Sequence, residues 1–204
     1  GQSVQGRELW ALLITDNPDI EEPEPEFKWV STMHGDEPLG TEMCRYMIDR
    51  LLNDYGVDGR ITDLVNSTAI WFVPLMNPDG LMLGTRNNAS GLDLNRSFPQ
   101  YLTHFTQTYY DGEPLNAEAY TPEIRHIMEW AAANSFTLTA NLHGGALLVN
   151  YPYDYVEGIP SGTDAPSPDD LLFEDVSLRY SINNVPMYNS VVFPDPLGPV
   201  ITTN

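Results

Sequence analysis

The stretch "WVSTMHGDEPLG" (residues 29–40) joins a strand pattern to a helix pattern within a few residues. Its first half completes a mostly apolar run that predicts a buried β-strand over residues 27–33. From Pro38 onward, apolar residues recur at helical spacing until the pattern stops near Gly56, which predicts a helix. The junction therefore presents a histidine and a glutamate, three residues apart, where a strand ends.

Strand and helix patterns alternate along the rest of the chain. Strands are expected at residues 8–15, 68–76, 136–145 and 146–153, and helices at 61–66, 121–135 and 167–182. The segment "NPDG" at 77–80 predicts a turn, and residues 80–120 a long functional loop. This order predicts a three-layer α/β/α fold with a mixed, mostly parallel sheet. Ligands of such sheets bind beyond the carboxyl ends of strands, where His34, Glu37 and His143 lie.

Composition narrows the class of protein. The 204 residues, 42% of them apolar, suit one sizeable core, and we expect residues 1–204 to be a single domain. A formal net charge of −20 would repel nucleic acid and anionic lipid, which excludes both as main partners. No apolar run approaches the length of a membrane span. The single cysteine, Cys44, excludes an internal disulfide and a cysteine-based zinc site.

The histidines and the glutamate at the strand ends predict a zinc site. Imidazole nitrogen and carboxylate oxygen suit Zn²⁺, and a catalytic site uses three protein ligands with one position left for water. His34 and Glu37 can reach one ion across the strand-to-helix turn, and His143 lies at a matching strand end. Taken alone, H-x-x-E is a weak motif, and a single histidine is more often a core residue. His104 and His126 receive no role.

Motifs along nearly the whole chain resemble those of the zinc carboxypeptidases, in the branch that contains carboxypeptidases N, E, M and D. In chain order they are "SVQGRELWALLITDNP", "EPEFKWVSTMHGDEPLG", "VPLMNPDG", "RNNASGLDLNRSFP", a helix that opens with "PE", "LTANLHGGALLVNYPYD" and "ITTN". Their order and spacing match the family. The resemblance implies the zinc carboxypeptidase fold, incomplete at both ends of this chain.

The resemblance implies a role for each residue of the zinc site and its neighbours. His34, Glu37 and His143 would hold one zinc ion per chain. Arg86 matches the arginine that polarises the scissile carbonyl and stabilises the oxyanion. Asp93 matches the aspartate that accepts the second ring N–H of the first histidine, although an aspartate in a polar loop also suits an Asx-turn.

Three further residues match the family's substrate-binding positions. Asn95 and Arg96 match the pair that grips the free C-terminal carboxylate of a peptide, for which a guanidinium fork and an amide are suitable donors. For Arg86 and Arg96 the alternative is a surface ion pair. Asp154 matches the carboxylate that gives this branch its preference for C-terminal Lys or Arg.

The family's general-base glutamate and substrate-capping tyrosine would follow Asn204, and a further helix would precede the first motif. Glu123 and Glu129 are no substitutes, because they lie on a helix away from the motif loops. We therefore expect the chain to be part of a longer enzyme. Without the base, these residues alone would be nearly inactive, because general acid–base catalysis contributes about 10²–10⁴-fold.

The resulting hypothesis is a zinc-dependent exopeptidase that removes a C-terminal residue, preferentially Lys or Arg, from peptides or proteins. Its partner is the C-terminus of the substrate, and resemblance and acidity together favour a secreted, periplasmic or extracellular protein. Two alternatives stay open: an inactive module that binds zinc and peptide C-termini, and a zinc deacylase of the same fold that acts on small acylated amino acids. The sequence says nothing about the oligomeric state.

Overall fold

The computed structural model describes residues 1–98, 120–152, 165–184 and 187 of the chain. They belong to two compact units, Gly1–Phe98 with Pro114–Gly144, and Pro99–Glu113 with Gly145–Asn204, which are described separately. In the described ranges, no helix combines the length and the apolar composition that a membrane span requires.

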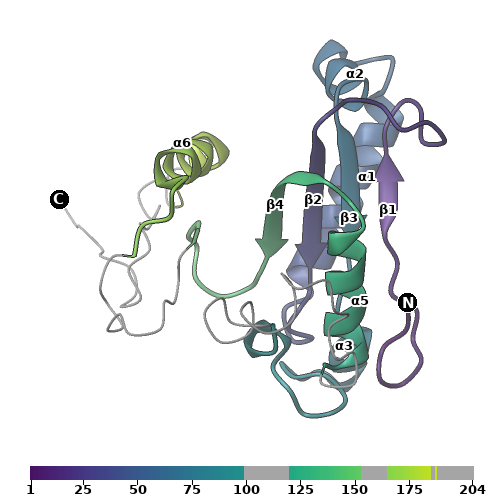
Figure 1. The fold of residues 1–204 in the computed structure, drawn as a ribbon, viewed down its shortest axis with the longest axis vertical. Coiled ribbons are helices and arrows are strands. Elements are labelled where there is room, and N and C mark those ends of the chain that lie inside the picture. The colour runs from purple at the N-terminus through teal and green to yellow at the C-terminus, as the bar shows by residue number, and fades with distance from the viewer. Residues whose placement is uncertain (99–119, 153–164, 185–186, 188–204) are drawn as a thin grey trace, which may run out of the picture. The chain divides into compact units, whose positions relative to one another are not determined.

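The first unit is built on a four-stranded sheet (Figure 1). Its strands are β1 (Leu12–Ile14), β2 (Glu26–Ser31), β3 (Ala69–Val73) and β4 (Phe136–Leu142), in the spatial order β1-β3-β2-β4. β1 is antiparallel to β3, whereas β3, β2 and β4 run parallel. The predicted mixed, mostly parallel sheet is confirmed. The strand expected at 8–15 is reduced to three residues, because this edge strand pairs with β3 only from Leu12↔Phe72 to Ile14↔Ile70.

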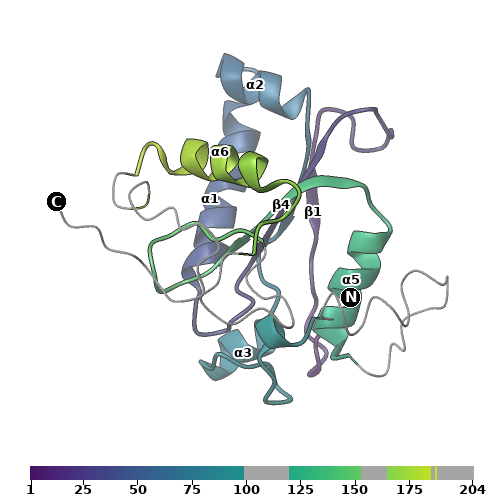
Figure 2. The same cartoon turned by 60° about the vertical axis from the view of Figure 1, so that its left-hand side comes forward.

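Helices cover both faces of this sheet, as the alternation of elements predicts. α1 (Leu39–Asp54) and α2 (Gly59–Val65) lie on one face and α5 (Pro122–Ala132) on the other (Figure 2). Because successive residues of a strand point to opposite faces, Ile70 and Phe72 pack into the core with the residues of α1 and α2. Trp71 instead faces α5, where its ring and that of Trp130 pack edge to face with centroids 5.6 Å apart.

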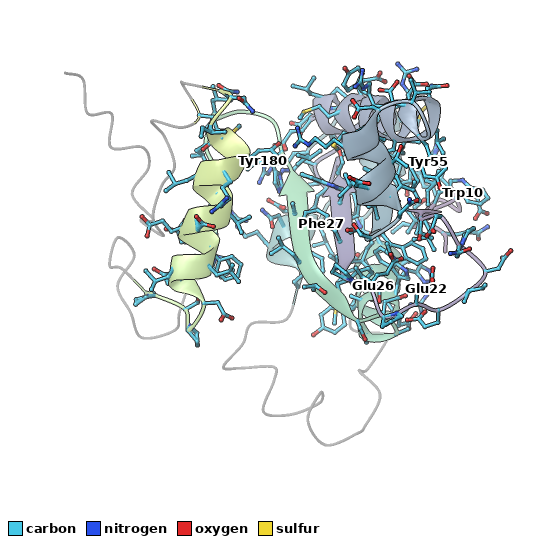
Figure 3. The ribbon with its side chains drawn as sticks, turned by 90° about the horizontal axis from the view of Figure 1, so that it is seen from above. Trp10, Glu22, Glu26, Phe27, Tyr55 and Tyr180 are labelled. Carbon is cyan, nitrogen blue, oxygen red and sulfur yellow. The ribbon has the colours of Figure 1, made fainter. Side chains whose placement is uncertain are left out.

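Glu26 joins three strands at the end of the sheet where β2 begins (Figure 3). Its carboxylate accepts hydrogen bonds from the indole N–H of Trp71 at 3.1 Å and from the backbone N–H of Ser135 at 3.2 Å. One side chain of β2 thus contacts β3 and the residue that precedes β4. These contacts help to fix the register that brings the opposite ends of the strands together.

The "NPDG" segment begins a helix rather than a simple turn, so this prediction was wrong. Asn77 Oδ1 accepts the N–H of Gly80 at 2.9 Å, and Pro78 occupies the first turn of α3 (Pro78–Leu83). Asparagine before proline suits a helix N-cap as well as a turn, because its side chain satisfies a free N–H in both. α3 ends at Gly84, whose φ of 63° is left-handed, and the 3₁₀ helix η1 (Leu94–Arg96) follows.

In the second unit the structure describes one helix, α6 (Asp170–Ser181), as the sequence predicts. The ring of Tyr151 stacks on that of Phe173 in this helix, with centroids 6.1 Å apart. Over the described residues of the strand expected at 146–153, which are 146–152, Val149 alone is in a β-bridge and no continuous strand forms. A continuous strand needs a neighbour along its length to satisfy its N–H and C=O groups.

Candidate metal centre

The parallel register of β2 and β4 sets the position of the candidate site. Ser31 is paired with Leu142 at the carboxyl ends of the two strands. His34 and His143 follow these residues by three and one positions, so both histidines lie at the same edge of the sheet. Glu37 lies in the turn between β2 and α1. Residues more than 100 positions apart in the chain therefore meet at one point.

The three predicted ligands are brought together. His34, which is 2% exposed, has its Nδ1 atom 2.9 Å from Glu37 Oε1 and 3.2 Å from His143 Nδ1. His143 Nδ1 lies 3.0 Å from Glu37 Oε2. The candidate ligand atoms all lie within 4.8 Å of one another, so these three described residues could hold a metal ion together.

This donor set fits zinc. Zinc bonds to imidazole nitrogen and carboxylate oxygen are about 2.0–2.2 Å long, so neighbouring ligand atoms in a tetrahedral site are roughly 3.3–3.5 Å apart. The distances of 2.9–3.2 Å between the ligand atoms are close to that value. Two imidazole nitrogens and a carboxylate present mainly lone pairs to one another. A cation between them can accept these lone pairs. The three residues can therefore hold a zinc ion with little rearrangement.

Glu37 is held in place from the β4 side. Its Oε2 atom accepts the backbone N–H of Gly144 at 2.8 Å. Burial raises the pKa of Glu37, but the hydrogen bond from the Gly144 N–H and the neighbouring imidazoles of His34 and His143 keep the pKa below its ordinary value. A Cβ atom at Gly144 would lie 3.1 Å from Glu37 Cγ, so this close approach depends on glycine.

Asp93 and Arg86 contact the buried histidine from the loop before η1. Asp93 Oδ1 lies 3.1 Å from His34 Nε2, and Arg86 Nη1 lies 3.1 Å from His34 Nδ1. A guanidinium only donates, so Nδ1 carries the lone pair and Nε2 carries the proton that faces Asp93. In this tautomer Nδ1 carries the lone pair that a metal ligand requires.

Asp93 also combines the two functions that the sequence left as alternatives. Its Oδ1 atom accepts the N–H of Asn95 at 2.9 Å, which caps η1, and its Oδ2 atom accepts Arg86 Nε at 3.0 Å. Burial raises the pKa of Asp93, but the hydrogen bonds from Arg86, Asn95 and His34, with the charge of Arg86, keep the pKa below its ordinary value. The carboxylate is thus both a turn residue and a partner of His34.

The expected carboxylate clamp is only partly assembled around this centre. Asn95 is linked to it through its backbone N–H on Asp93, whereas Arg96 Nη1 donates to the carbonyl of Asn95 at 2.9 Å. Asn95 also lines a cavity of about 220 Å³ on the α5 side of the sheet, together with Lys28 and Phe98. Asp154 lies outside the described residues.

Thr32 is a supporting residue that the sequence did not reveal. It is fully buried and has a left-handed φ of 50°, which costs a β-branched residue about 1–3 kcal/mol. The Thr32 hydroxyl lies 3.2 Å from the carbonyl of Glu37 and 2.7 Å from the hydroxyl of Thr41. The Thr41 hydroxyl in turn donates to the carbonyl of Pro74. These contacts hold the turn that carries the metal-ligand residues. Threonine has no preference for this conformation, so only the structure shows it.

Asn77 was read from sequence as a turn residue, but it also connects the two loops of the site. Its Nδ2 atom donates to the carbonyl of Met33 at 3.1 Å and to that of Arg86 at 3.4 Å. The N–H of Gly35 adds a bond to the same Arg86 carbonyl at 3.3 Å. The backbone of Arg86 is thereby fixed beside the turn that carries His34.

Comparisons with known proteins agree with this geometry. A family model described as zinc carboxypeptidase matches residues 1–199. Carboxypeptidase D of Mus musculus is 43% identical in an alignment of 199 residues that covers 92% of this chain and 14% of that protein. The carboxypeptidase N catalytic chain of Homo sapiens is 38% identical in an alignment of 208 residues that covers 89% of this chain and 45% of that protein. The chain therefore spans less than half the length of these relatives.

Solved structures show the same fold. The carboxypeptidase A of Helicoverpa armigera matches with a TM-score of 0.69 at 21% identity, over 91% of this chain and 48% of that one. At that identity the match concerns the fold alone, and it confirms the α/β architecture. The match of the family model over nearly the whole length decides the family. This chain belongs to the zinc carboxypeptidase family.

Proposed function

We propose that this chain forms the metal-binding part of a zinc-dependent exopeptidase that hydrolyses the C-terminal residue of peptides or proteins. The observation that carries the proposal is the meeting of His34, Glu37 and His143 at one edge of the sheet, in a chain of this family. When bound, zinc supplies a Lewis acid that polarises a carbonyl group and acidifies water. One ion per chain is proposed, because the three residues form one group.

The residues around the ligands prepare the site for this chemistry. Asp93 holds the proton of His34 on Nε2, so that Nδ1 faces the ion. The N–H of Gly144 fixes the carboxylate of Glu37. With Nε bound to Asp93, Arg86 directs Nη1 toward the ligand group, 3.5 Å from Glu37 Oε1. From there Arg86 can donate to the carbonyl oxygen of a substrate and stabilise the charge that develops on it.

Substrate selection is assigned to Asn95, Arg96 and Asp154. The first two would bind the free carboxylate of the substrate, which requires the side chain of Arg96, now bound to a carbonyl, to turn. Asp154 would bind a basic side chain at the substrate C-terminus, giving a preference for Lys or Arg. The net charge of −20 supports this assignment, because it attracts cationic peptides.

The proton-transfer step needs a base other than the described glutamates of α5. Both carboxylate oxygens of Glu123 are engaged in buried hydrogen bonds, and Glu129 faces Arg125 and His126 on its own helix. We therefore assign the base to a glutamate of the full-length protein that follows residue 204, as the resemblance implies. The same proposal treats residues 1–204 as parts of one catalytic domain that acts outside the cytoplasm.

The test is hydrolysis by the full-length protein, with and without zinc. Dansyl-Ala-Arg, the same peptide with an amidated C-terminus, dansyl-Ala-Ala and an N-acetyl amino acid are compared. We expect zinc-dependent release of arginine from the first substrate, little release from the amidated one and slower release of alanine. Hydrolysis of the N-acetyl amino acid alone would favour the deacylase. Binding of zinc and peptide without any hydrolysis would favour the inactive module.

A further inference from the structure

A short loop separates Arg86 from Asp93, the two residues that reach His34 from outside the ligand group. At its centre is Asn88, which is 3% exposed. Asn88 Oδ1 accepts the backbone N–H groups of Ser90 at 3.0 Å and Leu92 at 3.1 Å. The backbone N–H of Asn88 donates to the carbonyl of Leu92 at 3.0 Å. This one residue therefore fixes the shape of the loop.

The same side chain connects the loop to α5. Asn88 Nδ2 donates to Glu123 Oε2 at 3.2 Å, and Glu123 Oε1 accepts the N–H of Val4 at 3.1 Å. Glu123 is fully buried, and within the described residues it has no ion pair. A buried carboxyl group needs its hydrogen bonds, because desolvation is not offset otherwise. Glu123 and Asn88 thus form a buried hydrogen-bonded pair with a fixed polarity, in which Asn88 donates and Glu123 accepts.

The two ends of the loop are anchored differently. The carbonyl of Arg86 is bound by Gly35 N–H and Asn77 Nδ2, directly beside the turn that carries His34. At the other end, the carbonyl of Asp93 accepts the N–H of Arg96 at 3.0 Å and the hydroxyl of Ser97 at 2.7 Å, and Leu94 beside it is fully buried. The position of Asp93 relative to His34 is therefore set from two sides, by η1 and by the loop, whose shape Asn88 sets and Glu123 holds.

We propose that Glu123, acting through Asn88, is a positioning residue of the metal centre. It touches neither metal nor substrate; it sets the position from which Asp93 orients His34. This inference rests on the proposed function, because it assumes that His34, Glu37 and His143 bind zinc. It adds to that function a residue on another element, 30 positions beyond the loop that it controls.

The polarity of the pair allows a rescue experiment in the full-length protein. In Glu123→Gln, an amide group must face either Asn88 Nδ2 or the N–H of Val4, so one hydrogen bond is lost. In Asn88→Asp, two carboxyl groups face each other. The double variant N88D/E123Q reverses the polarity and restores every bond: Val4 N–H to Gln Oε1, Gln Nε2 to Asp, and both loop N–H groups to Asp.

The main readout is the zinc dissociation constant, measured by competition with a chromophoric chelator. Circular dichroism first establishes a temperature at which every variant is folded. Each single variant should bind zinc about 10-fold more weakly or worse, the range found when a partner of a metal ligand is lost. The double variant should return to within a few-fold of the wild type. Should E123Q not fold, Asn88→Ser takes its place: it removes the amide that donates to Glu123 and keeps a hydroxyl that can accept the N–H of Ser90.

Two control variants separate positioning from stability. Glu129→Gln makes the same chemical change on the same helix, at a side chain that is 57% exposed, and should leave zinc binding unchanged. Val65→Ala removes buried volume from α2, far from the loop in the sequence, and should lower the melting temperature without weakening zinc binding.

The inference is overturned if the single variants bind zinc like the wild type and differ only in melting temperature, or if the double variant stays as weak as the singles. These outcomes leave the proposed function intact. Absence of zinc binding by the wild type would instead remove the proposed function, and the inference with it.

Discussion

The metal centre and the N-terminal anchor at Asp79 are both clusters of polar groups around a buried residue, but their hydrogen-bond balance is opposite. Asp79 is fully buried, and its two oxygens accept bonds from Ser3 Oγ at 2.8 Å, Gln5 N–H at 2.9 Å and the guanidinium of Arg7. Donors and acceptors match there. At His34, lone pairs from two imidazoles and a carboxylate face one another instead. A complete cluster indicates a structural role, and an excess of acceptors indicates a cation site.

Loss of a zinc ligand should have the largest effect. The free energy of zinc binding at a structural site with four ligands is about 10–16 kcal/mol, which is roughly 3 kcal/mol for each ligand. His143→Ala should therefore weaken zinc binding by about 100-fold. In metal-free protein the same change should hardly affect unfolding, because it removes one of several acceptors that lack donors. Chelator competition and denaturant unfolding in EDTA measure both quantities. A marked loss of stability without metal would contradict the comparison.

The opposite result is expected at the anchor. Asp79→Asn weakens hydrogen bonds from three donors and the ion pair with Arg7, so the free energy of unfolding should fall by about 2–3 kcal/mol. Zinc affinity should stay within twofold of the wild type at a temperature where the variant is folded. Urea titration and chelator competition test these values. If zinc binding fell as much as stability, the two clusters would not be independent.

A smaller effect on zinc affinity is expected at the close contact between Gly144 and Glu37. In Gly144→Ala, the new Cβ would lie 3.1 Å from Glu37 Cγ, so Glu37 must move by a few tenths of an ångström. We expect zinc affinity to fall about tenfold, as for loss of other partners of metal ligands. Gly59→Ala, where a Cβ meets no atom within 4 Å, is the matched control and should bind zinc like the wild type.

The smallest effect should appear in the pH dependence of stability. Burial raises the pKa of Asp79, but hydrogen bonds from Gln5, Arg7 and Ser3, with the charge of Arg7, hold it below its ordinary value. A lowered folded-state pKa stabilises the protein above the unfolded-state pKa, near 4, and this contribution is lost as the pH falls through the folded-state pKa. Unfolding free energies of metal-free wild type and Asp79→Asn should therefore begin to converge as the pH falls below about 5, and should continue to converge as the pH passes through the folded-state pKa. Parallel curves would exclude Asp79 as the source.

The sequence predicted most of what local patterns determine. The mixed sheet and the meeting of His34, Glu37 and His143 could be inferred, because each histidine follows an apolar strand and parallel strand ends meet at one edge. The role of Asn77 was missed, because its motif suits both a turn and a helix cap. Residues 146–152 look like a strand, but within them Val149 alone is in a β-bridge, because pairing depends on a neighbour that sequence periodicity does not show. Glu123 gave no signal, because its partners Val4 and Asn88 are distant in the sequence.

The central claim is that two imidazoles and one carboxylate share a single zinc ion. X-ray absorption spectroscopy of the zinc-loaded full-length protein, after removal of excess metal, tests it most directly. The account predicts one zinc per chain, nitrogen and oxygen neighbours at about 2.0–2.2 Å, and the outer-shell scattering of two imidazoles. In His143→Ala, the imidazole scattering should fall to that of one imidazole. A sulfur neighbour near 2.3 Å, or a bound zinc without imidazole scattering, would contradict the account.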